Sequence, residues 1–424
     1  MNRKTKRHNI LTFCTFVAFA TVFSSCFGGS GGGSAAPDTN AGSSCSLPTT
    51  AGSGIVSGSN VMVVGVGTTS VCSGNVNIPC TSVTVCQVGS VAKCNTISDI
   101  LVDTGSFGLR IFSQAFTGSL SPPSANLTQV NDASAHAVAE CAQFGSAVDW
   151  GPVMSADVYL GGEAKVTTSI QVIDHTFGTG SLPAVCSAAE TSPSVAGING
   201  ILGVGLFPQD CGAGCVGTSG FANLYWGCNG GTCSGTKMPL ASQVANPVSL
   251  LATDNNGVIL DMPAVPSGGS SSAVGSLVLG IDTQANNASA GFTKYPASMS
   301  ATFSTTFNGH AYASSFIDSG SNGYFFPNSQ SLTECSGFYC AGSMSADSAT
   351  MTGSGGSPSS SVCFTLGDAN SLFNSGNPAL SDIGADAGFG STFDWGLPFF
   401  YGRKVYVGIS GKNSSLGTGP YWAF

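Results

Sequence analysis

Two short segments of this sequence repeat one pattern, in which an aspartate ends an apolar run and begins a turn. Asp103 follows the run 100–102 and opens the turn Asp103-Thr104-Gly105-Ser106. Asp318 follows the run 315–317 and opens the turn Asp318-Ser319-Gly320-Ser321, so each half of the chain contributes one copy. Glycine at the third position allows the sharp backbone geometry that points the carboxylate outward. The duplication predicts that two carboxylates from distant parts of the chain share one site.

Two carboxylates that hold one water between them cannot both ionise comfortably, so such a pair keeps one proton over a wide pH range. The ionised carboxylate takes a proton from the water as the water attacks a carbonyl carbon. The protonated carboxyl donates toward the carbonyl oxygen, and no covalent intermediate, metal or cofactor is required. Asp103 and Asp318 are therefore the predicted acid–base pair.

The elements that must position these aspartates are predicted to be short strands. Only 8% of the residues are charged, 42% are hydrophobic, and 59 glycines supply tight turns. Regular helical crossovers, which a parallel α/β sheet would need, are lacking. The fold class is therefore predicted to be all-β, with β-rich runs at 60–64, 81–86, 97–102, 153–160, 168–173, 201–205, 257–260, 276–279, 315–317 and 404–409.

The length of 424 residues exceeds one ordinary core and predicts two lobes, at 60–244 and 245–424. The N-terminus reads as an export signal over 1–25, because basic residues precede an apolar run too short to span a bilayer. Small residues before Cys26 resemble a bacterial lipobox, which predicts lipidation of Cys26 in the cell envelope; an ordinary secretory signal cleaved nearby is the alternative. Phe27 favours the outer membrane, with the body facing the periplasm or the cell surface. Residues 26–59 are rich in Gly and Ser and are predicted to form a flexible tether.

The net charge of -9 argues against nucleic acid as a partner, because binding to phosphates draws on clustered Lys and Arg. Setting aside Cys14 and Cys26 leaves 14 of the 16 cysteines, an even number that predicts disulfides in an oxidising compartment. Cys86 and Cys94 are placed to staple a hairpin. Zinc is an alternative for Cys211/Cys215 and Cys228/Cys233, but no histidine lies near them.

The two aspartate turns resemble those of the pepsin family of aspartic peptidases, and the resemblance extends from about Val61 to Phe424. Four further segments support it in the same order: 143–146 with 160–162 resembles the flap hairpin, 199–205 and 394–400 resemble the strands that complete each site, and 275–282 resembles the second-lobe signature. The resemblance implies a bilobal, pepsin-like double-ψ β-barrel fold with a cleft between the lobes. It also implies a monomeric aspartic endopeptidase that acts on a peptide or protein without a cofactor, in a largely uncharacterised bacterial lipoprotein branch.

The resemblance assigns roles within the turns. Ser106 and Ser321 are expected to hydrogen-bond the outer carboxylate oxygens, while Thr104 and Ser319 brace the two turns. Gly105 and Gly320 complete these turns.

The predicted lid, 144–146, departs from the family pattern. Phe144, followed by Gly145 and Ser146, stands where the family usually has Tyr, and Arg110 stands where a Trp commonly partners that Tyr. We hypothesise that Arg110 or Trp150 rebuilds the lid contact by stacking. A surface position for Arg110 is the alternative.

Two other function classes are alternatives to a peptidase. A pepsin-like fold can serve as a non-catalytic binding protein or a structural envelope lipoprotein, since fold does not fix function. A serine hydrolase is poorly supported, because Gly-x-Ser-x-Gly occurs only in low-complexity stretches such as 28–32 and the histidines occupy no triad context.

Overall fold

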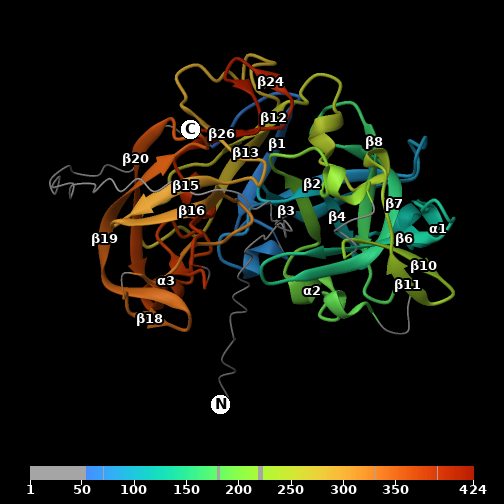
Figure 1. Cartoon of the computed structure of the whole chain (residues 1–424), viewed down its shortest axis with the longest axis horizontal. Coiled ribbons are helices and arrows are strands. Elements are labelled where there is room, and N and C mark those ends of the chain that lie inside the picture. The colour runs from blue at the N-terminus through green and yellow to red at the C-terminus, as the bar shows by residue number, and fades with distance from the viewer. Residues whose placement is uncertain (1–53, 70, 179–181, 218–222, 330, 389) are drawn as a thin grey trace, which may run out of the picture.

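The computed structural model describes residues 54–424 except 70, 179–181, 218–222, 330 and 389 (Figure 1). The predicted signal peptide, Cys26 and the tether up to residue 53 lie outside the described residues. The last part of the predicted tether already contacts the body, since Gly54 N donates to Asp261 Oδ1 (3.1 Å) and Gly162 N donates to the Ser59 carbonyl (2.7 Å). Within the described ranges, no helix is long and apolar enough to cross a membrane.

The first lobe is built on a closed ring of six strands. The pairing order is β2–β3–β9–β4–β8–β7, and β7 returns to pair with β2. Alternating apolar residues point inward from these strands, which places Val83, Val102, Leu109 and Ile170 in the buried core. The bounds of the strands are β2 (Cys80–Cys86), β3 (Cys94–Asp103), β4 (Phe107–Phe112), β7 (Val148–Tyr159), β8 (Val166–Ile173) and β9 (Gly200–Val204).

The second lobe repeats this ring with the order β15–β16–β22–β17–β21–β19, and β19 returns to pair with β15. A stack of aromatic rings, including Phe326, Phe364, Phe393 and Trp395, fills its interior. The bounds are β15 (Phe303–Phe307), β16 (His310–Ile317), β17 (Tyr324–Phe326), β19 (Phe338–Thr352), β21 (Gly384–Asp386) and β22 (Asp394–Trp395).

Strand directions in the two rings agree pair by pair. β9 runs parallel to β3 and antiparallel to β4, so it lies between the two strands that flank the Asp103 turn. In the same way β22 runs parallel to β16 and antiparallel to β17, which flank the Asp318 turn. The predicted all-β, bilobal architecture is therefore confirmed, and each predicted β-rich run overlaps a strand.

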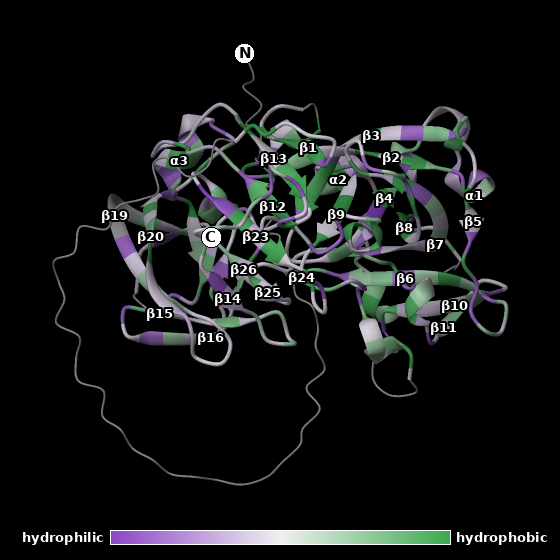
Figure 2. Ribbon diagram, turned by 90° about the horizontal axis from the view of Figure 1, so that it is seen from above, coloured by the Kyte–Doolittle hydropathy of each residue, from purple (hydrophilic) through white to green (hydrophobic). Residues whose placement is uncertain are grey.

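A shared sheet joins the lobes, which lie side by side in Figure 1. β1 (Val61–Val66) pairs with β2 of the first ring through Gly65 and with β13 (Ala273–Leu279) of the second half over six residues. Strands β1, β12 and β13 are largely hydrophobic in Figure 2, as expected for a sheet buried between two lobes. The sheet continues through β12 (Gly257–Asp261), β23 (Lys404–Gly408), β26 (Tyr421–Ala423) and β14 (Lys294–Pro296).

The remaining elements decorate this framework. In the first lobe, β6 (Ala137–Gln143) and β7 form a hairpin, and β10 (Tyr225–Asn229) adds to the free edge of β6. The helix α3 (Ala369–Ser375) begins where Asp368 accepts from Ser371 N (2.8 Å) and ends at Gly376, whose φ is 70°. The other elements are β5 (Thr128–Gln129), β11 (Thr232–Gly235), β18 (Glu334–Cys335), β20 (Ser359–Asp368), β24 (Asn413–Ser414), β25 (Gly417–Thr418), α1 (Pro123–Asn126), α2 (Pro193–Ala196) and α3 (Ala369–Ser375). Short 3-10 helices are η1 (Cys72–Gly74), η2 (Ser113–Ala115), η3 (Gly118–Leu120), η4 (Ala184–Cys186), η5 (Gly212–Cys215), η6 (Leu240–Ser242), η7 (Pro247–Leu250) and η8 (Leu397–Phe400).

All thirteen cysteines within the described residues are disulfide-bonded, which confirms the disulfide prediction. Cys86–Cys94 staples the β2–β3 hairpin as expected. The two close pairs that left a zinc site open are also disulfides, so zinc ligation is excluded for them. Further bridges are Cys72–Cys80, Cys141–Cys186, Cys211–Cys215, Cys228–Cys233 and Cys335–Cys340, and Cys363 is also disulfide-bonded.

Candidate active site

The first aspartate turn is held by hydrogen bonds to its own carboxylate. Asp103 is the last residue of β3 and is 2% exposed. Its Oδ1 accepts from Gly105 N (2.8 Å) and Ser106 N (3.2 Å), and its Oδ2 accepts from the Ser106 hydroxyl (2.5 Å). These donors fix the carboxylate at the end of the strand, and Ser106 occupies the expected supporting position.

The second turn repeats this arrangement after β16. Asp318 is fully buried, its Oδ1 accepts from Gly320 N (2.7 Å), and its Oδ2 accepts from the Ser321 hydroxyl (3.1 Å). The same residue types therefore make the same bonds in both lobes, as the repeated sequence predicts.

Reciprocal hydrogen bonds between Thr104 and Ser319 lock the two turns together. Thr104 N donates to Ser319 Oγ (3.1 Å), and Ser319 N donates to Thr104 Oγ1 (2.9 Å). Each hydroxyl then donates into the opposite lobe, Ser319 Oγ to the Val102 carbonyl (2.7 Å) and Thr104 Oγ1 to the Ile317 carbonyl (3.4 Å). The two backbone N–H groups and the two hydroxyls therefore all find their partners in the opposite turn or strand. A relative shift of the turns would leave these buried polar groups unpaired.

The two carboxylates lie directly against the opposite turns. A Cβ atom on Gly105 would lie 2.5 Å from Asp318 Cγ, and one on Gly320 would lie 2.8 Å from Asp103 Oδ1. Only glycine fits at these positions, because any side chain would collide with the opposing carboxylate. The structure thus brings together residues from the two halves of the chain that the sequence singled out.

The predicted lid is the turn of the β6–β7 hairpin, closed by Phe144 N donating to the Ala147 carbonyl (2.8 Å). Gly145 and Ser146 are exposed at the tip. Phe144 is half-buried and packs against the apolar cluster that contains Leu101, two residues before Asp103. The lid therefore packs on an apolar cluster to which the strand of the first aspartate contributes.

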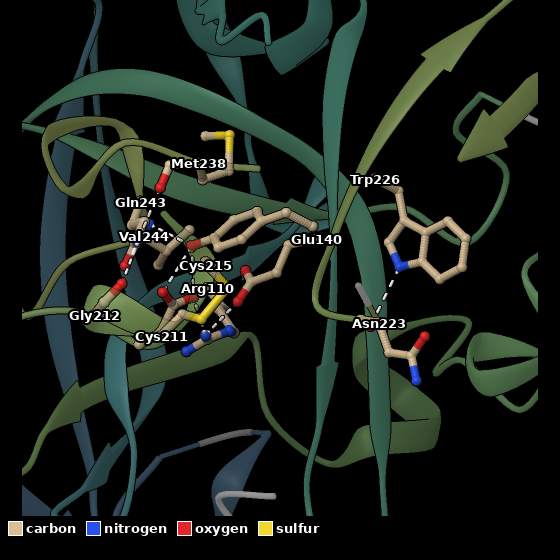
Figure 3. Close-up of a disulfide and its surroundings, with 12 residues drawn as sticks. Arg110, Glu140, Cys211, Gly212, Cys215, Asn223, Trp226, Met238, Gln243 and Val244 are labelled. Atoms are coloured by element: carbon tan, nitrogen blue, oxygen red, sulfur yellow. Dashed lines mark hydrogen bonds and ion pairs between the residues drawn. A yellow bond between two sulfur atoms is a disulfide. The ribbon is translucent and has the colours of Figure 1, made fainter. Parts of the chain in front are cut away.

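Arg110 lies beneath this hairpin and is 3% exposed, so the surface alternative is wrong. Its Nη1 donates to the Phe107 carbonyl (2.8 Å), its Nη2 donates to Glu140 Oε1 (2.5 Å), and its Cζ lies 5.7 Å from the Phe144 ring centroid. Nη2 also contacts Asp210 Oδ2 (3.3 Å), and Figure 3 shows Arg110 beside Glu140 and the Cys211–Cys215 disulfide. Burial alone would lower the pKa of Arg110, but the carboxylates of Glu140 and Asp210 raise it, so the guanidinium stays charged.

The structure does not bring Trp150 to the lid tip. Its indole is fully buried, and Nε1 donates to the Phe177 carbonyl (3.0 Å) in an apolar cluster that includes Cys141 and Cys186. Phe144 packs in a different cluster. Cys141 and Trp150 pair across the hairpin, and their side chains point to the face opposite the one on which Glu140 contacts Arg110. Of the two stacking partners proposed from the sequence, Arg110 alone contacts Phe144.

A pocket of about 460 Å³ opens between η1 and α2. Val71, Pro193 and Val195 contribute apolar side chains to its wall, and Asn75 contributes a polar group. The pocket adjoins the apolar cluster on which Phe144 packs, since that cluster includes Cys72 of η1 and Ala196 of α2. Among the described residues, no group of three or more metal-ligating side chains is found.

Comparisons with known proteins place the chain in an uncharacterised family. Residues 56–424 match the family described as "Protein of unknown function (DUF3443)", and the chain belongs to this family. No curated protein sequence matches the chain. Among solved structures, the chain is similar to an aspartic proteinase from Irpex lacteus, with 15% identity and a TM-score of 0.49, over 86% of this chain and 96% of that chain. The fold assignment itself rests on the strand pairings of the two rings.

Proposed function

We propose that this member of the DUF3443 family is an aspartic endopeptidase in which Asp103 and Asp318 activate a water for hydrolysis of a peptide bond. The observation that carries the proposal is the interlocked pair of turns, in which each buried carboxylate packs against the glycine of the other turn. In the proposed mechanism the two carboxylates share one proton, which supplies an acid and a base at one place.

The chemistry divides between the two aspartates. The ionised carboxylate accepts a proton from the water as the water attacks the peptide carbonyl carbon, while the protonated carboxyl donates to the carbonyl oxygen. Collapse of the tetrahedral intermediate then breaks the C–N bond, and a proton passes to the departing amine. Ser106 and Ser321 keep the outer oxygens hydrogen-bonded, so the inner oxygens face the water.

The substrate is proposed to be an extended peptide held between the dyad and the lid. Phe144 offers an apolar lid surface without a hydroxyl and packs on an apolar cluster. This surface does not select a charged side chain, so cleavage next to apolar residues is expected.

The cellular setting is part of the same proposal. The signal-like segment 1–25 and the lipobox-like residues before Cys26 support export and anchoring by a lipid on Cys26, with the body in the bacterial envelope. The disulfide-bonded cysteines fit an oxidising compartment.

The test is cleavage of a randomised peptide library by the full-length protein from acid to neutral pH. Cleavage is expected in the wild type and is expected to fall by about a thousandfold or more in Asp103→Asn and in Asp318→Asn. Asp386→Asn, which changes an exposed carboxylate, serves as the matched control and should cleave like the wild type. Absence of cleavage at every pH, or cleavage that survives both dyad substitutions, would overturn the proposal.

The second candidate is a non-catalytic peptide-binding or structural envelope lipoprotein on the same fold. The lid favours it, because Phe144 lacks a donor and the hairpin is fastened by the Cys141–Cys186 bridge and by β10. This reading predicts that library peptides are bound but recovered intact from the wild-type protein.

A further inference from the structure

The lid hairpin covers a buried group of charges that the proposed mechanism does not use. Glu140 on β6 and Asp210 on the loop before η5 contact Arg110 on β4, and Asp149 on β7 feels the charge of Arg110 without contacting it. We call these four residues the acid cluster. Glu140 is fully buried, Asp149 is 3% exposed, and the side chain of Asp210 is 5% exposed. A single guanidinium cannot neutralise three carboxylates, so the cluster carries excess negative charge if all of them ionise.

The contacts of Arg110 show that its guanidinium does not pair with all three carboxylates. The same nitrogen, Nη2, donates to Glu140 Oε1 (2.5 Å) and to Asp210 Oδ2 (3.3 Å). Figure 3 marks the contact between Arg110 and Glu140 with a dashed line. Nη1 is directed to a backbone carbonyl, and Nε has no hydrogen-bond partner among the described residues. Within the described residues, Arg110 donates to Phe107, Glu140 and Asp210 and not to Asp149.

The cluster is also short of hydrogen-bond donors. Glu140 Oε2 and Gln171 Oε1 are buried acceptors that have no hydrogen-bond partner within the described residues. The amide nitrogen of Gln171 donates to the carbonyls of Glu140 (2.9 Å) and Asp149 (3.2 Å), so this side chain lies between the two lid strands. A proton on a carboxyl of the cluster would both reduce the charge and provide a donor.

Burial and the two carboxylates that face Asp149 raise its pKa, and Arg110 is the group that opposes the rise. Burial raises the pKa of Asp149 to about 7, Arg110 on β4 opposes the rise, and Glu190, which follows η4, and Glu140 on β6 add to it. Burial and the charge of Glu140 likewise raise the pKa of Asp210 well above its ordinary value. Tyr225 on β10 donates to both oxygens of Asp210 (2.7 Å each), and burial holds the Tyr225 hydroxyl in its neutral form by raising its pKa.

We propose that the acid cluster is a proton-operated lock on the lid, in which uptake of a proton by Asp149 fastens the β6–β7 hairpin to the first lobe. Opening of the hairpin would expose Asp149 to water, where a carboxyl ionises with its ordinary acidity. The closed hairpin therefore binds the proton more tightly than the open hairpin, and by linkage a falling pH favours closure.

The direction of the effect follows from the raised pKa. Below the ordinary range of an aspartic acid, Asp149 is protonated whether the hairpin is open or closed, and the lock is fully engaged. As the pH rises, Asp149 ionises first in the open form, which stabilises the open form relative to the closed form. This relative stabilisation increases with pH until Asp149 also ionises in the closed form, near pH 7. The lid is thus held most firmly in acid and most loosely above neutral pH.

The test is amide hydrogen exchange in the full-length protein, followed separately for the β6–β7 hairpin and for β12 and β23 in the shared sheet. After correction for chemical exchange rates, hairpin protection should rise by up to about a hundredfold between about pH 7 and about pH 5, since each pH unit is worth a factor of ten. Asp149→Asn should remove this rise, while Asp386→Asn should keep it. The inference deepens the proposed function, but the measurement needs no turnover, so its failure is distinguishable from failure of the peptidase proposal.

Glu190→Gln provides a second variant if Asp149→Asn does not fold. Glu190 is half-buried and raises the pKa of Asp149, so its neutralisation should move the midpoint of the protection change to lower pH. Hairpin protection that is independent of pH in the wild type, or equal rises in the hairpin and in β12 and β23, would overturn the proposal.

Discussion

Asn77 and Leu380 exchange two hydrogen bonds between the lobes: Asn77 Nδ2 donates to the Leu380 carbonyl (2.7 Å), and Leu380 N donates to Asn77 Oδ1 (2.8 Å). The same side chain donates to the Asn322 carbonyl (2.8 Å) and accepts from the Tyr401 hydroxyl (2.9 Å). Asn77 is fully buried, and its φ of 54° lies in the left-handed region, which asparagine tolerates better than most residues. One side chain of the first lobe therefore satisfies three segments of the second.

Asn77→Ala should destabilise the protein strongly. The substitution leaves the Leu380 N–H and the carbonyls of Leu380 and Asn322 without their hydrogen-bond partner. It also keeps a left-handed backbone at a residue that tolerates it less well than asparagine does. The free energy of unfolding should therefore fall by about 3 kcal/mol. Denaturant unfolding monitored by tryptophan fluorescence measures it. Asn370→Ala, at an exposed position on α3, is the control and should change the free energy of unfolding by less than about 0.5 kcal/mol. Equal stability of the two variants would contradict the bridging role.

Thr104→Val should damage the geometry of the dyad. Valine keeps the shape but removes the oxygen that accepts from Ser319 N, leaving a buried N–H unpaired at a cost of about 1–3 kcal/mol. Peptide cleavage should fall by about tenfold or more because the two turns lose their common register.

Thr104→Ser is the matched control, because it retains the hydroxyl. It should keep most of the activity and stability of the wild type. A Thr104→Val variant that cleaves as fast as Thr104→Ser would show that the reciprocal bonds do not position the aspartates.

The aspartate turns could be predicted from the sequence because their determinants are local. An apolar strand, an aspartate, a hydroxyl residue and a glycine occupy adjacent positions, and the second copy repeats the order. The interlock of Thr104 with Ser319 followed only from the family resemblance, since no local pattern indicates which turns meet across 215 residues. The role of Asn77 between the lobes could not be predicted from the sequence, because its partners lie more than 240 residues away.

The acid cluster was missed for a related reason. Arg110 contacts Glu140 and Asp210, which lie 30 and 100 residues away, and a lone arginine in an apolar strand is ordinarily read as exposed. Part of the cysteine- and glycine-rich segment 208–235 forms β10 and β11, although glycine has a low propensity for strands. Pairing of β10 with the edge of β6 supplies the tertiary contacts that override the weak local propensity.

Arg110→Ala should be the most damaging single change beneath the lid. It leaves the buried carboxylates of Glu140 and Asp210 without their cation, for which a loss of about 3–5 kcal/mol is expected. Peptide turnover should fall further than in Lys93→Ala, which alters an exposed residue. Equal turnover in the two variants would remove the role of Arg110 in supporting the lid.

Arg110→Lys separates charge from geometry. Lysine retains a cation for Glu140 but loses the planar group that faces Phe144 and the second nitrogen that holds the Phe107 carbonyl. Stability should recover in part, while KM for an apolar peptide should stay above the wild-type value. Full recovery of both quantities would indicate that charge alone matters at this position.

Loss of the Cys141–Cys186 bridge should loosen the lid more than loss of Cys211–Cys215. The first bridge closes a loop of 45 residues and the second a loop of 4, so chain entropy predicts stabilisations of about 4 and about 2 kcal/mol. Cys141 belongs to the lid hairpin, and Cys211 follows Asp210, which contacts Arg110. The two double-alanine variants therefore form a matched pair. Denaturant midpoints rank their stabilities, and hydrogen exchange in β6 localises the effect. The expected result is a lower midpoint and faster β6 exchange in Cys141→Ala/Cys186→Ala; the reverse ranking would mean that native contacts, and not loop closure, set the strength of each bridge.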